Sequence, residues 1–313
     1  MINCIAPFEV PRFENEDYGF ELYFFGDRQE GSVGYLPEAW ADFKDEFKRS
    51  KRKKAAIGLG DYGDWLRPSL RPAVSGALGK DDSARRMLDK AILKEHDKII
   101  DAHSFLEGYM IGVHEGHHNW TTLDQINLDQ RLATALKTRF LGFTATTRLV
   151  LRAMYDGNVA RRKDGYCTNG HVVTLFSTHG NANGRKVPGA LAWVENNLAN
   201  SILADLYVIG HGCKSGNDAP NERVEVRRVG PPGIKRSVPR IMAVGGFTRS
   251  YTDGWESDYV QRAGMSPQPP GWGVIRFKLV NTVNKSIAHG ITSRRSKQMD
   301  ISCINRFYTE QDD

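Results

Sequence analysis

The stretch "AAIGLGDYGDW", residues 55–65, decides the fold. An apolar run ends there at Gly60, and an aspartate, Asp61, follows directly. Continuous apolar runs of about four to eight residues that stop at turn residues are typical of strands buried on both faces. The stretch therefore predicts a buried strand that delivers a carboxylate to the loop at its end.

The same arrangement, an apolar run that ends beside a glycine and a polar residue, occurs four more times. The runs are "ELYFFGD" (21–27), "EGYMIGVHE" (107–115), "HVVTLFSTHG" (171–180) and "ADLYVIGHG" (204–212). Apolar residues between the runs follow the spacing of amphipathic helices. They are Leu36, Trp40, Phe43 and Phe47; Leu88, Ile92 and Ile99; and Leu191, Val194, Leu198 and Ile202. Alternating strands and helices predict a layered α/β fold.

Length and composition set the class of protein. The chain has 313 residues, of which 40% are hydrophobic and 26% are charged, as is ordinary for a soluble globular protein. That length suits one large α/β domain or two average ones. No run of about 18 apolar residues occurs, so we expect no transmembrane helix and no membrane partner. The first 20 residues lack a basic stretch followed by an apolar core, so we expect no secretory signal.

The cysteines and the net charge bear on compartment and partners. The four cysteines are scattered along the chain, which predicts free thiols in a reducing compartment: the cytoplasm, or the host cytoplasm if a phage encodes the protein. The net charge of +6 and the pI of about 9.1 fit a phosphate-bearing partner. They fit a solvated basic surface equally well.

Four segments lie outside the strand and helix pattern. We expect residues 1–20 to form an irregular N-terminal arm and residues 281–313 a basic, irregular C-terminal tail. The main domain then covers 21–280, with insertions at 155–170 and 213–240.

Five strand ends each carry a polar residue just after a glycine or beside one. These residues are Asp27, Asp61, His114, His179 and His211. Active sites of open α/β sheets lie beyond the carboxyl ends of the strands, so we expect the five side chains to meet. Aspartate and histidine together suit a hard or borderline divalent metal.

The order and spacing of these motifs resemble the calcineurin-like metallophosphoesterases over roughly residues 20 to 280. The resemblance is carried by "GDYGDW" (60–65), "GVHEGHH" (112–118), "STHGNANG" (177–184) and "YVIGHGC" (207–213). The segment "TRSYTDGWESDY" (248–259) is similar to forms found in phage and prokaryotic genomes. The resemblance implies a four-layer α/β/β/α sandwich with two divalent ions, manganese, zinc, iron or magnesium, at one edge.

The resemblance also implies a set of metal ligands. Asp27, Asp61, His179 and His211 match the family pattern, and Asp61 would bridge the two ions. Three positions depart from it. Gln29 and Cys213 stand where the family has histidines, and Val113 stands where it has an asparagine that binds the second metal. An amide oxygen or a thiolate can still bind metal, whereas valine has no donor atom.

The remaining candidates concern substrate. By the resemblance, His114 would contact the phosphate or the leaving group. Arg28 can bind a phosphate bidentately, or it can pair with Asp27 or Glu30. Arg185, at the end of "NANGR" (181–185), is a weaker phosphate-binding candidate.

Three further features have two interpretations each. His117 and His118 either touch the metal or substrate or are bystanders, and Asp64 is a loop-capping residue or a ligand. The basic run "KRSKRKK" (48–54) is a solvated helix end or a nucleic-acid contact.

These observations predict a metal-dependent phosphoesterase. Arginine-rich insertions and a basic net charge favour a polyanionic phosphodiester, with DNA or RNA among the expected partners. The alternative is a catalytically impaired protein that keeps the fold and acts as a binding or structural module. The three altered ligands favour that alternative, and the five retained polar strand ends oppose it.

Overall fold

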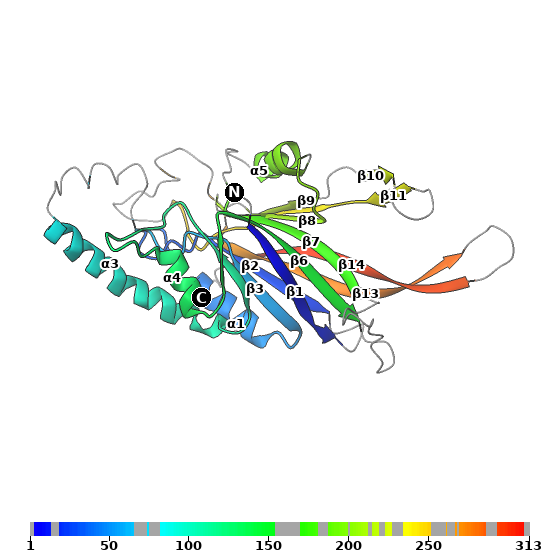
Figure 1. Ribbon diagram of the computed structural model, residues 1–313, viewed down its shortest axis with the longest axis horizontal. Coiled ribbons are helices and arrows are strands. Elements are labelled where there is room, and N and C mark those ends of the chain that lie inside the picture. Colours follow the sequence, from blue (N-terminus) through cyan, green and yellow to red (C-terminus); the bar gives the residue numbers. More distant parts are fainter. Residues whose placement is uncertain are drawn as a thin grey trace.

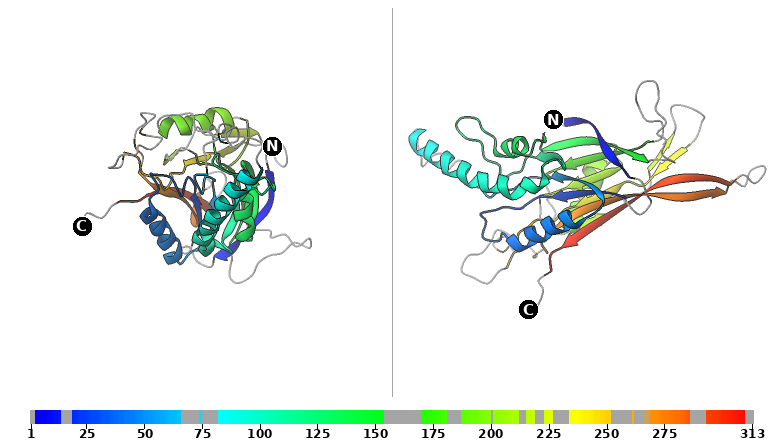
Figure 2. Two further views of the ribbon diagram at one scale, coloured as in Figure 1. Left: turned by 90° about the vertical axis from the view of Figure 1, so that its left-hand side faces the viewer. Right: turned by 90° about the horizontal axis from the view of Figure 1, so that it is seen from below.

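The computed structural model describes the chain in blocks separated by gaps. The described residues are 3–13, 19–65, 74, 82–153, 170–180, 187–199, 201–211, 215–218, 223–226, 234–251, 261, 267, 269–285 and 293–309. Two six-stranded sheets face each other, and helices cover their outer faces (Figures 1 and 2). The four-layer α/β/β/α sandwich predicted from the sequence is confirmed.

The first sheet has the strand order β14-β13-β2-β3-β4-β5. Its members are β2 (Phe20–Phe25), β3 (Lys53–Gly58), β4 (Met110–His114), β5 (Arg139–Gly142), β13 (Gly271–Lys285) and β14 (Ser293–Phe307). The strands from β2 to β5 are parallel, and β13 joins β2 antiparallel. Three α-helices accompany this sheet: α1 (Pro37–Arg49), α3 (Asp82–His103) and α4 (Leu128–Ala135). A 3-10 turn, η1 (Ser104–Leu106), follows α3.

The second sheet has the strand order β1-β6-β7-β8-β12-β9. Its members are β1 (Asn3–Phe13), β6 (Thr144–Ala153), β7 (Gly170–Thr178), β8 (Leu206–Ile209), β9 (Gly216–Asp218) and β12 (Arg240–Ala243). Helix α5 (Val187–Val194) and a π-helical turn, η2 (Glu195–Ala199), lie against its outer face (Figure 1). A separate ribbon pairs β10 (Arg223–Val226) with β11 (Ile234–Ser237).

Two apolar clusters lie on the two faces of the first sheet. Phe24 and Ile57 from the first sheet pack with Leu149, Leu175 and Val208 from the second, in one buried cluster between the sheets. The next residue along β2, Phe25, belongs instead to the cluster beneath the helices, because successive strand residues face opposite sides. That alternation explains why these strands are apolar throughout.

The helix-side cluster is rich in aromatic rings. Trp40, Phe43 and Phe47 of α1, spaced as predicted, pack on Phe25 and on Tyr23 at ring-centroid distances of 5.0 to 6.3 Å. Offset and edge-on ring pairs at such distances each add roughly 0.5–1.5 kcal/mol beyond burial. The cluster therefore fixes α1 against the strand that leads into Asp27.

Both chain ends differ from their predicted irregular conformation. β1 pairs in parallel with β6, and β14 pairs with the full length of β13, so the predictions of an irregular arm and an irregular tail were wrong. The pairing of β1 shifts register between Ile5 and Phe8 and between Val10 and Phe13. Pro7 and Pro11 lie in those two intervals, and a proline has no N–H to donate to the ladder. Because prolines normally argue against a strand, this edge strand could not be predicted from the sequence.

The two predicted insertions are described only in part. Residues 155–169 lie outside the described residues, as do 213–214, 219–222 and 227–233. The described parts of 213–240 form β9, β10 and β11 and the first residue of β12. No described helix is long and apolar enough to cross a membrane.

Candidate metal centre

The loops that follow β2, β3, β7 and β8 meet at one edge of the sandwich. The backbone N–H of Asp27 donates to the carbonyl of Gly60 (3.0 Å), and that of Gln29 donates to the carbonyl of Asp61 (2.9 Å). On the other side, the side chain of His179 reaches the carbonyl of Leu59 (2.6 Å). These hydrogen bonds therefore hold the predicted strand ends next to one another.

Four of the predicted ligands have a left-handed backbone. The φ angles are 46° at Asp27, 45° at Gln29, 54° at Asp61 and 51° at His211. A non-glycine residue in this region costs of order 1–3 kcal/mol, and such residues cluster at functional sites. The left-handed backbone changes the direction of each side chain at the point where its strand ends.

A compact group of four potential metal ligands lies at this edge. One ligand atom from each of Asp61, His117, His179 and His211 lies within 4.8 Å of all the others. Asp61 and His179 are buried, whereas His117 and His211 are partly exposed. Three of the four were predicted ligands, and the fourth, His117, had been left between ligand and bystander.

Two buried atoms of this group face each other without a hydrogen bond of normal geometry. Oδ2 of Asp61 and Nε2 of His179 lie 3.3 Å apart, and neither has a partner of normal geometry among the described residues. A buried polar atom without a partner is costly, so such atoms are usually satisfied by something bound. Carboxylate oxygen and imidazole nitrogen are common ligands of divalent zinc, so the residues fit a metal ion.

The protonation of His179 is set by its surroundings. Its Nδ1 atom donates to the carbonyl of Leu59, which leaves Nε2 facing Asp61. Burial lowers the pKa of His179, but the carboxylates of Asp61 and Asp27 outweigh burial and raise it to about 9. Burial raises the pKa of Asp61, yet the nearby His179 and His211 hold it well below its usual value. Without a metal, the proton on His179 supplies the missing positive charge.

His117 carries an uncharged ring into the group. Its Nδ1 lies 3.1 Å from Nδ1 of His211, and the two ring centroids are 4.1 Å apart. Burial, with the charges of His179 and His211, lowers the pKa of His117 to about 4. Two imidazole nitrogens at this distance either share one proton or direct their lone pairs at one cation.

Two glycines make this close packing feasible. A Cβ atom on Gly116 would lie 2.1 Å from the backbone nitrogen of Asp61 and 2.2 Å from its Oδ1 atom. A Cβ atom on Gly60, where φ is 102°, would lie 2.7 Å from Nδ1 of His179. The buried carboxyl of Asp129, at the start of α4, accepts from the backbone N–H of Gly116 (2.9 Å). The loop that carries His117 is therefore pressed onto Asp61 and held there.

His118 lies next to the group and pairs with Asp64. Its backbone N–H donates to Oδ1 of Asp61 (2.8 Å), and its Nδ1 lies 2.8 Å from Oδ1 of Asp64. Burial lowers the pKa of His118, but the bond to Asp64 and the charge of Asp61 outweigh burial and raise it. His118 thus holds a proton more tightly than a free imidazole does, beside the candidate metal ligands.

His114 is placed between the sheets. Its side chain is fully buried, its Nδ1 lies 2.9 Å from the carbonyl of Gly142, and its Nε2 lies 2.8 Å from the hydroxyl of Ser177. Burial lowers the pKa of His114 to about 4. Both ring nitrogens are engaged, so His114 bridges the sheets. Its predicted substrate contact stays a prediction.

Val113 belongs to the core beneath the helices. Its side chain is 0% exposed and lies in the cluster that contains Phe25 and Trp40. The backbone of β4 shifts register against β3 between Ala56 and Ile57, and the loop continues past His114 before it reaches the site. His117, three residues beyond His114, is the donor that this loop contributes to the four-ligand group.

Arg28 is occupied away from the metal ligands. Its guanidinium lies 2.8 Å from the carboxylate of Glu30, donates to the hydroxyl of Tyr35 (2.9 Å) and lies 4.7 Å from the ring centre of Trp40. The pairing with Glu30 is one of the two alternatives expected from the sequence. Cys213 and Arg185 lie outside the described residues.

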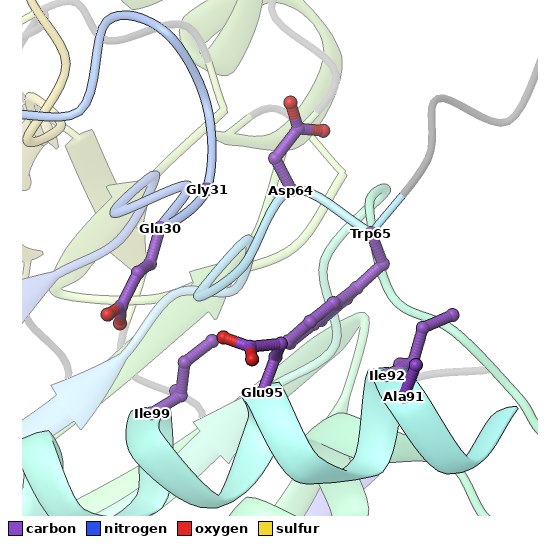
Figure 3. A pocket seen from close by; sticks show the side chains of 8 residues that line it. All are labelled: Glu30, Gly31, Asp64, Trp65, Ala91, Ile92, Glu95 and Ile99. Atoms are coloured by element: carbon purple, nitrogen blue, oxygen red, sulfur yellow. The ribbon is translucent and has the colours of Figure 1, made fainter. Parts of the chain in front are cut away.

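A cavity adjoins the site on the helix side. It has a volume of about 310 Å³, and Glu30, Asp64, Trp65, Glu95 and Ile99 are among its lining residues (Figure 3). Figure 3 shows the carboxylate of Asp64 turned away from those of Glu30 and Glu95. The cavity is therefore a neighbour of the His118–Asp64 pair and separate from the four-ligand group.

Comparisons with known proteins find only weak similarity between this chain and solved structures. No family model matches the chain, and no curated protein matches its sequence. Among solved structures, Vps29 from Chaetomium thermophilum matches with a TM-score of 0.32 and 10% identity, over 93% of this chain and 98% of that one. A predicted phosphoesterase from Streptococcus pneumoniae matches with a TM-score of 0.29 and 9% identity, over 89% and 97%.

A metallophosphoesterase from Sphaerobacter thermophilus matches with a TM-score of 0.32 and 11% identity, over 82% of each chain. Similarity at this level assigns neither a substrate nor a partner. The layers and the ligand group described above stand on the strand pairing and the distances of this chain alone.

The placement of Val113 leads to a prediction about Val113→Asn. The new amide would be buried among apolar side chains without a partner, so we expect the free energy of unfolding to fall by about 1–3 kcal/mol. Metal affinity should not change. Thermal melting and a manganese titration measure both effects. Val33→Asn, the same change at a residue that is 53% exposed, is the control and should leave the melt unchanged. Tighter metal binding with an unchanged melt would contradict the placement.

Proposed function

We propose that the protein is a metal-dependent phosphoesterase of the calcineurin-like kind that hydrolyses phosphodiester bonds. The observation that carries the proposal is the buried pair of Oδ2 of Asp61 and Nε2 of His179, which face each other at 3.3 Å without a hydrogen bond of normal geometry, within a group of four ligand atoms. A group of this composition at the carboxyl edge of two sheets fits a metal-assisted hydrolase better than a structural ion-pair network.

Each residue of the centre has a proposed role. Asp61, His117, His179 and His211 would hold one ion. Asp27 is 1% exposed, and its charge acts on both His179 and His118, so we assign it to a second ion, together with Gln29 and Cys213. Bound divalent ions would polarise the phosphoryl oxygens and lower the pKa of water. Histidine-rich donors suit zinc, manganese or iron better than magnesium.

The leaving group calls for a proton, and we assign its delivery to His118. Asp64 fixes Nδ1 of His118, which leaves the Nε2 atom for substrate, and the bond to Asp64 together with the charge of Asp61 raises the pKa of the ring. The backbone bond to Asp61 fixes the ring beside the ligand group. We therefore transfer to His118 the role that the sequence pattern had given to His114.

Substrate charge and compartment follow from the chain as a whole. A net charge of +6 favours a polyanionic phosphodiester over a small phosphomonoester. Cys303, whose thiol is free, supports the reducing cytoplasm as the compartment. The alternative is a binding or structural module, and the group of four potential ligand atoms, to which His117 contributes, is the feature that favours the enzyme over it.

The first prediction of the proposed function concerns Asp61→Asn. This change keeps an oxygen to accept from His118 but removes the charge opposite His179, so manganese-dependent hydrolysis of bis-p-nitrophenyl phosphate should be abolished. Asp42→Asn, on the exposed side of α1, is the matched control and should retain full activity. Retained activity in Asp61→Asn would place the reaction elsewhere.

The second prediction separates a proton donor from a structural histidine. Nitrophenolate leaves without protonation, whereas the alkoxide of a dinucleoside phosphate does not. His118→Asn should therefore lower kcat on the dinucleotide by about 10²–10⁴-fold and on the nitrophenyl ester far less. Asp64→Asn should show the same pattern with a smaller loss. Equal losses on both substrates would mean that His118 only maintains the structure.

A further inference from the structure

The ribbon formed by β13 and β14 continues past the rest of its sheet. The two strands pair from Gly271 opposite Phe307 to Lys285 opposite Ser293, whereas β2 pairs with β13 only from Gly273 to Phe277. In the described part of the chain, no third strand pairs with the ribbon beyond Phe277. Figures 1 and 2 show it projecting from the body at the end opposite α3. We call residues 278–285 and 293–300 the ribbon arm.

The apolar core ends where the arm begins. Phe277 is fully buried between the sheets, and Ile301, its partner on β14, packs against the same cluster. Eight further residues on each strand, at about 3.3 Å each, extend the arm by roughly 25 Å. An isolated two-stranded hairpin is only marginally stable in water. Such an extension is more typical of a binding element than of a part of the core.

The arm is strongly basic. It contains five cationic residues and one acidic residue: Lys278, Lys285, Arg294, Arg295 and Lys297, with Asp300. The neighbouring β10–β11 ribbon, which lies toward the same end of the molecule, adds Arg223, Lys235 and Arg236 against Glu225 (Figure 1). The positive net charge of the chain is therefore concentrated partly on two ribbons at one end.

The register places cationic positions on both faces of the arm. Directly opposed residues share a face, and successive residues alternate between faces. Lys285, Arg295 and Lys297 occupy positions of one face. Arg294 and Lys278 occupy positions of the other, where Lys278 is directly opposite Asp300. A partner that meets Arg294 as well as the three cationic positions of the first face must present negative charge on two sides of the ribbon.

We propose that the ribbon arm binds duplex nucleic acid by entering a groove. The major groove of DNA is about 12 Å wide and admits a two-stranded β-ribbon. Phosphates border a groove on both sides, which matches cationic positions on both faces. A membrane surface meets one face only, and a second copy of the arm would oppose like charges. Binding by the arm goes beyond the proposed hydrolysis and does not depend on a metal.

The test is DNA binding in the presence of EDTA, which separates the arm from the metal centre. The triple variant Arg294→Gln/Arg295→Gln/Lys297→Gln should bind a fluorescent duplex at least tenfold more weakly at low salt. The slope of log K against log salt should fall by about 2–3, roughly one for each lost phosphate contact. Arg294→Lys/Arg295→Lys keeps the charge and should retain most of the affinity.

The matched control is Lys90→Gln/Lys94→Gln/Lys98→Gln, which removes equal charge from exposed residues of α3, at the opposite end of the molecule. It should change DNA affinity less than about twofold, with the salt slope nearly unchanged. Equal losses in both triple variants would mean binding by net charge and would overturn the proposal. So would a wild-type protein that binds no duplex at low salt, or one that binds phosphatidylserine vesicles and not DNA.

Discussion

The contact between Asp61 and His179 is the constraint on which the site depends. A carboxylate and an imidazole, both with fully buried side chains, approach to 3.3 Å without a normal hydrogen bond. Burying charge costs several kcal/mol per ion unless a counter-charge compensates it. The raised pKa of His179 and the lowered pKa of Asp61 supply that compensation in the free protein. A divalent ion would supply it when His179 is neutral, so metal binding and release of that proton are coupled.

The surrounding structure is shaped to keep this contact in place. Gly60 and Gly116 allow two loops to approach within distances that no side chain could occupy, and Asp61 itself has a φ of 54°. Such a backbone is tolerated only where the rest of the fold determines it. The aromatic cluster around Phe25 and the apolar layer between the sheets provide that determination. Stability built in the core thus offsets strain at the edge.

Much of the fold could be predicted from the sequence, because buried strands are continuous apolar runs that end at glycine. The same rule located Asp61, His179 and His211, which lie in the ligand group. It could not decide the role of His117, because that residue lies in the loop, three positions beyond the end of β4, where no strand pattern fixes the direction of a side chain. β1 and β14 were missed because edge strands with prolines or many charges lack the apolar pattern of central strands. Contacts between distant segments, such as Arg28 with Trp40, follow from packing and not from local sequence.

Metal content is the most direct measure of whether this edge of the sandwich is a metal centre. The protein should be purified with manganese or zinc, passed over a desalting column and analysed by elemental mass spectrometry, with Asp61→Asn treated alongside. We expect at least one ion per wild-type chain, held with Asp61, His117, His179 and His211, and a near-complete loss in the variant. A wild-type chain that retains no ion, or a variant that retains as much, would contradict a metal centre and favour a binding module built on the same fold.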